Sequence, residues 1–99
     1  MTEAPAIQAM VWYKEEDWKQ LRRILPDSYL LPKKYKDWLA RAEAKEKEVR
    51  GRGNVVIKVF IDPETFPAWC KKKGREMDAE SRTLMAIEVA TAQQFGERF

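Results

Sequence analysis

The stretch from Asn54 to Glu64, NVVIKVFIDPE, joins an alternating apolar run to a helix-starting sequence. Valine and isoleucine fill every second position of that run, which is the two-residue period of a β-strand. Asp62 is a preferred helix N-cap, and the proline after it suits the first position of a helix. We therefore predict a strand over 54–61, followed by a helix over 63–73.

The chain on either side of this stretch predicts one further strand and three further helices. AIQAMVWY, residues 6–13, is rich in β-branched and aromatic residues at its end and predicts a first strand over 7–13. Apolar residues recur at helical spacing in three further segments. The helices they predict run over 15–25, 33–50 and about 79–95.

The predicted fold is α+β, with the order strand, helix, helix, strand, helix, helix in one small domain over residues 7–96. Residues 1–6 and 97–99 are expected to be tails. We expect the helices to cover one face of a two-stranded sheet. Because a helix hairpin between the strands reverses the chain twice, we expect the strands to pair antiparallel.

The last helix and the small sheet together predict a homodimer. Leu84, Ala92 and Phe95 form one apolar arc that Met85 and Val89 extend, while other apolar residues of this helix lie outside it. Such a helix is buried on more than one side, and two strands alone leave open edges. A two-fold dimer could extend the sheet to four strands and cover this helix. Glu88 falls inside the arc, where it needs a basic partner unless it lies at the arc's edge and points to water.

Composition excludes several classes of protein. The 99 residues contain no His, which removes the commonest general base and most zinc sites. One Cys cannot form a disulfide within the chain, and the N-terminus lacks the pattern of a secretory signal, so we expect a cytoplasmic protein. No apolar stretch is long enough to span a membrane. We expect no cofactor and no metal site, and an enzyme is the least favoured class because no nucleophile–base pair is visible.

The single cysteine, Cys70, lies in the sequence FPAWCKKKG. Phe66, Trp69 and Cys70 share one stripe of the predicted helix, near the C-terminal end where the helix dipole disfavours a thiolate. We therefore expect Cys70 to pack as a small apolar side chain rather than to act as a nucleophile.

Two surfaces are candidates for binding. Aromatic and basic residues surround a proline-flanked loop and suit a protein partner; they are Tyr29, Lys33, Lys34, Tyr35 and Lys36. The alternative is nucleic-acid binding by basic residues; the candidates are Arg22, Arg23, Lys34, Arg52 and Lys72. The net charge of only +3 favours the interpretation of the basic clusters as solvated helix faces rather than as a nucleic-acid surface. Nucleic-acid affinity would fall steeply between about 50 and 200 mM salt.

Three runs of this chain resemble small proteobacterial proteins of uncharacterised function: WYKEEDWKQLRRILPD, LPKKYKDWLARAE and VVIKVFIDPETFPAWCKKKGREMDAESR. The resemblance covers residues 11 to about 90, and its most specific part is IDPETFPAWC. It implies a bacterial, cytoplasmic setting and carries no catalytic residue over to this chain.

Overall fold

The computed structural model describes residues 6–96, with side chains described as far as Gln93. It confirms the predicted α+β class and the predicted order of elements. The elements are β1 (Ile7–Trp12), α1 (Glu15–Ile24), a short 3-10 turn η1 (Ser28–Leu30), α2 (Tyr35–Gly51), β2 (Val55–Phe60), α3 (Thr65–Lys73) and α4 (Ala79–Gly96). The predicted tails fall almost entirely outside the described residues. None of the helices within 6–96 has the length and hydropathy that crossing a bilayer requires.

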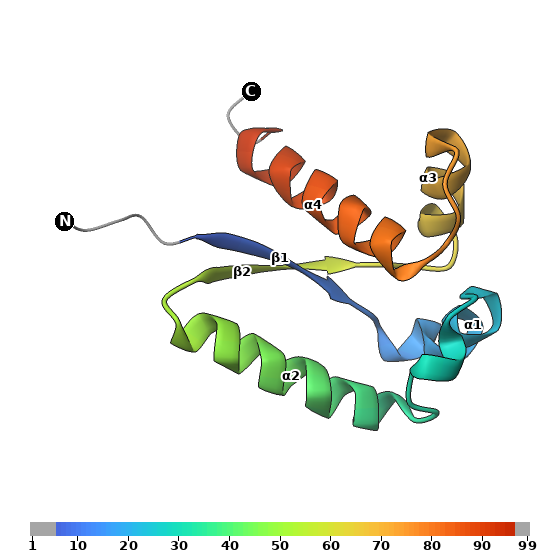
Figure 1. The fold of residues 1–99 in the computed structure, drawn as a ribbon, viewed down its shortest axis with the longest axis horizontal. Helices are drawn as coiled ribbons and strands as arrows, with labels where there is room; N and C mark the ends of the chain where they lie inside the picture. The colour runs from blue at the N-terminus through green and yellow to red at the C-terminus, as the bar shows by residue number, and fades with distance from the viewer. Residues whose placement is uncertain (1–5, 97–99) are drawn as a thin grey trace.

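The two strands pair in parallel, so the expected antiparallel pairing is wrong. Ile7 lies beside Val55, and the register continues to Trp12 beside Phe60. The reason is that only α2 runs the length of the sheet between the strands. Its 17 residues span about 25 Å, enough to return the chain along a strand of about 20 Å. The ten-residue α1 lies at the far end and acts as part of the turn (Figure 1).

Helices cover both faces of the sheet, so the expectation of a single covered face is also wrong. In Figure 1, α4 lies above the sheet and α2 lies below it. The even-numbered side chains of the strands face α2, as the contact between the Trp12 and Trp38 rings shows. The odd-numbered ones face α4, where Val59 packs with Ala86 and Ala90. Parallel sheets are normally buried on both faces, and both sets of strand positions are largely apolar here.

An aromatic cluster joins β1, α1 and α2. Trp38 is its centre, with ring centroids 5.4 Å from Trp12, 4.9 Å from Tyr13 and 5.6 Å from Trp18. The Trp18 indole N–H donates to the Lys33 backbone carbonyl at 3.0 Å. Edge and tilted ring pairs contribute about 0.5–1.5 kcal/mol beyond their burial. The cluster therefore fixes α1 and α2 against the carboxyl end of β1.

A buried ion pair ties the η1 region to the start of α4. The Arg82 guanidinium donates to both carboxylate oxygens of Asp27, at 2.9 and 2.6 Å. Arg82 is buried, while Asp27 keeps partial contact with solvent. The bidentate geometry orients the two segments, which are 55 residues apart in sequence.

The helix ends agree with the predicted signals, although two helices begin two residues later than predicted. The Asp62 carboxylate accepts hydrogen bonds from the backbone N–H groups of Glu64 and Thr65, and α3 begins at Thr65. Similarly, α2 begins at Tyr35 rather than at residue 33. The Phe66 N–H donates to the Asp62 carbonyl, and Pro67, in the first turn of α3, has no N–H to make the next bond of that series. Gly74 ends α3 with a φ of 67°, a left-handed conformation that glycine adopts without strain.

The buried face of α4 differs from the predicted arc. Leu84 and Ala92 are exposed, and the buried positions are Ser81, Arg82, Met85, Ala86 and Ala90. The side chain of Phe95 lies outside the described residues. Glu88 is half exposed and has partners: its carboxylate accepts from the Trp69 indole N–H at 2.6 Å and lies 3.2 Å from the Lys73 ammonium. Glu88 thus sits at the edge of the buried face and links α4 to α3.

Candidate functional site

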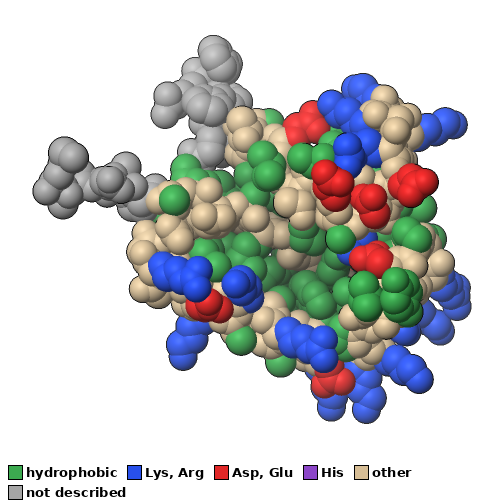
Figure 2. Space-filling model, in the orientation of Figure 1, with side chains coloured by type: hydrophobic (Ala, Val, Ile, Leu, Met, Phe, Trp, Pro, Cys, Tyr) green, Lys and Arg blue, Asp and Glu red, His purple; other side chains and the backbone are tan. Residues whose placement is uncertain are grey.

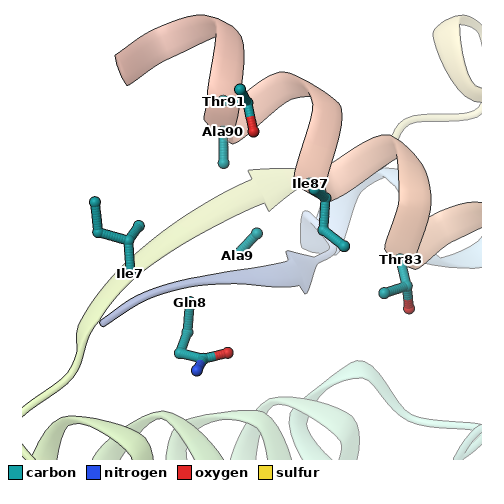
Figure 3. Close-up of a pocket in the computed structure, with 7 residues that line it drawn as sticks. All are labelled: Ile7, Gln8, Ala9, Thr83, Ile87, Ala90 and Thr91. Atoms are coloured by element: carbon teal, nitrogen blue, oxygen red, sulfur yellow. The ribbon is translucent and has the colours of Figure 1, made fainter. Parts of the chain in front are cut away.

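An apolar groove lies between β1 and α4. Its volume is about 520 Å³, and its apolar walls are Ile7 and Ala9 on the strand and Ile87 and Ala90 on the helix (Figure 3). The remaining lining residues are polar but uncharged: Gln8, Thr83 and Thr91. Exposed apolar surface lined without charge is typical of a surface that another protein covers.

The groove runs along the free edge of β1. The Val55 N–H donates to the Ala6 carbonyl, and the Ile61 N–H donates to the Trp12 carbonyl, both at 2.9 Å. In a parallel ladder this alternation continues, so the even-numbered residues of β1 bond to β2. The backbone N–H and C=O groups of Ile7, Ala9 and Val11 therefore point away from β2, toward the open edge.

The two edges of the sheet differ in charge. From Ala6 to Tyr13 the sequence has no charged residue, so nothing repels another strand from the edge of β1. The edge of β2 carries Lys58 at the middle of the strand. Its ammonium lies 3.3 Å from the Glu46 carboxylate and 4.2 Å from the centre of the Trp12 ring. Charged residues in edge strands are a common defence against unwanted pairing.

Hydrophobic side chains are also visible at the level of the whole surface. Figure 2 shows them gathered in a hollow between α4 and α2, with both basic (Lys, Arg) and acidic (Asp, Glu) side chains around the rim.

The predicted aromatic–basic surface is only partly formed. Tyr29 is 81% exposed, and Leu30 beside it is 66% exposed. Lys33, Lys34 and Lys36 are also exposed. Tyr35 is partly buried instead: its hydroxyl donates to the Tyr13 carbonyl at 2.9 Å, and its ring packs against those of Trp18 and Trp38. Burial raises the pKa of the Tyr35 hydroxyl.

The residues proposed to bind nucleic acid do not form one surface. Arg22, Arg23 and Lys34 belong to α1 and the segment before α2. Arg52 follows the far end of α2, at the opposite end of the molecule from α1 (Figure 1), and its guanidinium pairs with Glu48. Lys72 lies on α3. A nucleic acid would have to span both ends of the molecule to contact all five.

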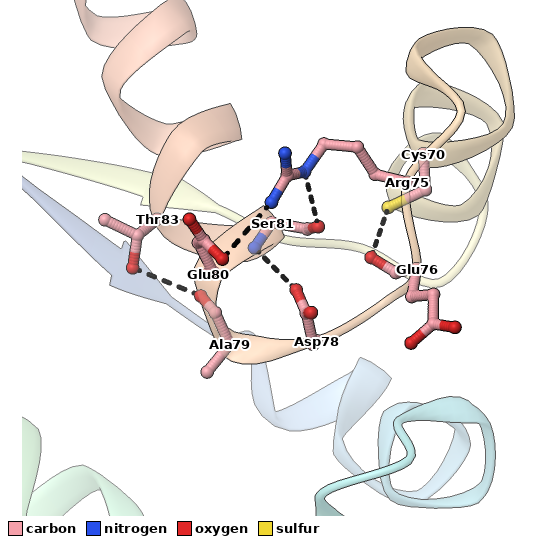
Figure 4. A network of polar contacts seen from close by, with 8 residues as sticks. All are labelled: Cys70, Arg75, Glu76, Asp78, Ala79, Glu80, Ser81 and Thr83. Atoms are coloured by element: carbon pink, nitrogen blue, oxygen red, sulfur yellow. Dashed lines mark hydrogen bonds and ion pairs between the residues drawn. The ribbon is translucent and has the colours of Figure 1, made fainter.

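Cys70 lies in the core, as predicted. Its side chain is buried with Phe66, and its Sγ donates to the Glu76 carbonyl at 3.7 Å (Figure 4). Burial raises the pKa of the Cys70 thiol, and the nearby Asp78 carboxylate acts in the same direction. The polar contacts around it serve the turn into α4: Asp78 accepts from the Ser81 backbone N–H at 2.8 Å, and Arg75 Nε donates to the Ser81 hydroxyl at 2.9 Å. Burial of the thiol, rather than these contacts, disfavours its ionised form.

A second hollow lies at the carboxyl ends of the two strands, the position where parallel sheets often bind ligands. It is polar and is bordered by Lys14, Asp17, Asp62 and Glu64. The Asp62 carboxylate is already used in capping α3, which contributes to holding its pKa below the usual value. Within the described part of the chain, no three acidic or cysteine side chains lie close enough to hold a metal ion.

Sequence reasoning missed the residues that form the groove. Ile7 and Ala9 fall within the predicted first strand and Ile87 outside the predicted arc of the last helix, and none of them is among the predicted site residues. The signal that could have indicated them is the run of eight residues without charge from Ala6 to Tyr13, in a chain that is 35% charged. That run becomes informative only when one edge of the strand is known to be unpaired.

Comparison with protein-family models, with curated proteins and with solved structures gave no match to this chain. The resemblance to the proteobacterial family therefore remains an expectation.

Proposed function

We propose that this protein is a protein-interaction module that acts as a homodimer. The observation that carries the proposal is the uncharged, unpaired edge of β1 beside an apolar groove. Backbone groups at such an edge gain hydrogen bonds when another strand joins them, and the groove offers apolar contacts beside those bonds. Natural proteins usually protect an edge of this kind unless it is used.

The chemistry of the described residues supports binding better than catalysis. Cys70 is buried, which raises the pKa of its thiol, and the Asp27 and Asp62 carboxylates are engaged in an ion pair and a helix cap. An enzyme needs a nucleophile or a base exposed to its substrate, and these groups are occupied by structural roles.

The exposed aromatic–basic surface is the part of the proposal that concerns other proteins. Tyr29 and Leu30 project from η1 beside Lys33 and Lys34, which suits an acidic partner with an apolar anchor point. We also propose that the protein is bacterial and cytoplasmic. The resemblance to the proteobacterial proteins supports this, and so does the single free cysteine, which suits a reducing compartment.

The test is the mass of the protein in solution. Light scattering at micromolar concentrations should give twice 11.7 kDa. Ile87→Lys places a charge in the groove and should shift the protein toward the monomer. Leu84→Lys is the matched control, because Leu84 is also an exposed apolar residue of α4 but does not line the groove. A wild-type monomer at these concentrations, or equal dissociation by both variants, would contradict the proposal.

A further inference from the structure

We propose that two copies of this protein join their β1 strands antiparallel, with the two-fold axis at Ala9, to form one four-stranded sheet. This inference rests on the proposed homodimeric function and specifies which segment of the partner occupies the groove. It makes the partner's own β1 the strand that completes the edge.

The hydrogen-bonding groups of β1 favour an antiparallel pair. Ile7, Ala9 and Val11 carry the outward N–H and C=O groups, as the bonds from Val55 to Ala6 and from Ile61 to Trp12 establish. A two-fold axis along the strand would place N–H opposite N–H and carbonyl opposite carbonyl. An axis perpendicular to the sheet reverses the partner strand and places each donor opposite an acceptor.

We place the two-fold axis where the largest number of outward backbone N–H and C=O groups of β1 form hydrogen bonds with the partner strand. With the axis at Ala9, Ala9 pairs with the partner's Ala9, and Ile7 pairs with the partner's Val11. All three outward residues then exchange both of their backbone hydrogen bonds. Moving the axis toward Trp12 would bring in Tyr13, whose carbonyl already accepts the Tyr35 hydroxyl.

The side chains agree with this register. The side chains of Ile7, Ala9 and Val11 lie on the α4 side of the sheet, where Ala9 and Val11 pack against the cluster that contains Ala86 and Ala90. Figure 3 shows Ala9 below Ala90. The smallest of them, Ala9, would lie at the axis, where two identical side chains meet. Ile7 is 49% exposed, and pairing would cover it with the partner's Val11. Because α4 lies over β1, the partner's α4 would approach the groove through its own Ile87.

The charge distribution favours a second copy over an acidic or basic partner. A two-fold contact sets each surface against the same surface, so charged residues there would meet their own charge. The protein carries a net charge of +3, yet neither the strand from Ala6 to Tyr13 nor the lining of the groove contains a charged residue. An acidic or basic partner would find no complementary charge in the groove.

Amide hydrogen exchange on the unaltered protein tests the register directly. At concentrations where the mass is that of the dimer, the N–H groups of Ile7, Ala9 and Val11 should exchange at least tenfold more slowly than after dilution to the monomer. The outward N–H groups of β2, at Val56, Lys58 and Phe60, are the internal control and should not change with concentration. A dimer in which the β1 groups stay unprotected would overturn this inference and leave the homodimer standing.

A pair of variants gives a second readout. Ile7 and Val55 are neighbours in register, face the same side of the sheet and are 49% and 44% exposed. Ile7→Lys would place a charge beside the partner strand and should weaken the dimer at least tenfold. Val55→Lys lies one strand further from the partner and should leave the dimer intact. Equal dissociation constants for the two variants would overturn the proposed pairing. A wild-type protein that is monomeric throughout would overturn both the pairing and the proposed function.

Discussion

At the scale of single residues, a substitution is expected to be costly where a polar group is buried with a partner. The Arg82 guanidinium is buried and donates two hydrogen bonds to Asp27. These hydrogen bonds hold the pKa of the Asp27 carboxyl below its usual 3.8. Removing one member of such a pair leaves a charge in a poorly solvated place, which costs more than the pair itself contributes.

We expect Asp27→Asn to lower the free energy of unfolding by about 3 kcal/mol at neutral pH. Because the folded pKa is depressed, this stabilisation is present above the unfolded pKa and is lost as the pH falls through the folded one. Urea unfolding at pH 7 and at pH values below about 3 should show the difference from wild type shrinking in acid. Asp37→Asn, at an exposed position of α2, is the control and should have little effect. A difference that persists unchanged in acid would contradict the assignment.

Cys70 provides a second prediction at the same scale. Its burial and raised pKa predict that a thiol-specific aromatic disulfide labels the native protein only through unfolding or local opening. The labelling rate at neutral pH should rise with urea concentration and approach that of the unfolded chain. Complete labelling of the native protein within seconds would show that the thiol is accessible and that its packing role is misassigned.

Individual elements could be predicted from the sequence better than their arrangement. The alternation in 54–61 and the capping residues Asp62 and Asp78 act locally, so the strand and the helix starts nearby could be recognised without knowing the fold. Whether the two strands pair parallel or antiparallel depends on how many of the helices between them run the length of the sheet. That number is decided by how the helices pack, which local sequence patterns do not indicate. The buried face of α4 was missed because it includes Ser81 and Arg82, which a hydrophobic pattern places in solvent. Tyr35, expected on the binding surface, is partly buried because its hydroxyl bonds to the Tyr13 carbonyl, a backbone partner that a side-chain pattern does not indicate.

The ends of α2 and α3 give opposite predictions for the same substitution. Gly74 ends α3 with a φ of 67°, so Gly74→Ala should lower stability by about 1 kcal/mol. Gly51 is helical, and a Cβ there would meet no atom within 4 Å. Gly51→Ala should therefore raise stability by about 0.5–1 kcal/mol. Thermal unfolding of both variants measures the contrast, and a shift of the same sign in both would contradict the assigned backbone conformations.

The whole molecule is thin in the direction in which its strands pair. Figure 1 looks down the shortest axis, which measures 20 Å, with one helix above the sheet and one below it. A two-stranded sheet of this kind has little stability of its own and depends on the layers that cover it. Joining a second copy along β1 would double the number of strands in one continuous layer.

Thermal stability should therefore depend on protein concentration. For a dimer that dissociates on unfolding, a tenfold rise in concentration should raise the unfolding midpoint by about 2–4 °C. Calorimetry over two decades of concentration measures this slope. The Ile7→Lys variant should show no slope in the range where it is monomeric, whereas Val55→Lys should keep the wild-type slope. If the thermal unfolding midpoint of the wild-type protein does not depend on concentration, the proposed homodimer is contradicted.

The unequal edges of the sheet also limit how far such an assembly can grow. A protein whose sheet can pair at both edges forms open-ended assemblies, whereas a protein whose sheet can pair at one edge stops at the dimer. In the proposed pairing β1 is the edge that joins, and the charged Lys58 in the middle of β2 would disfavour pairing at the other edge. Replacing Lys58 with an uncharged β-branched residue should let the β2 edge pair as well as the β1 edge. The expected product is then an insoluble fibre.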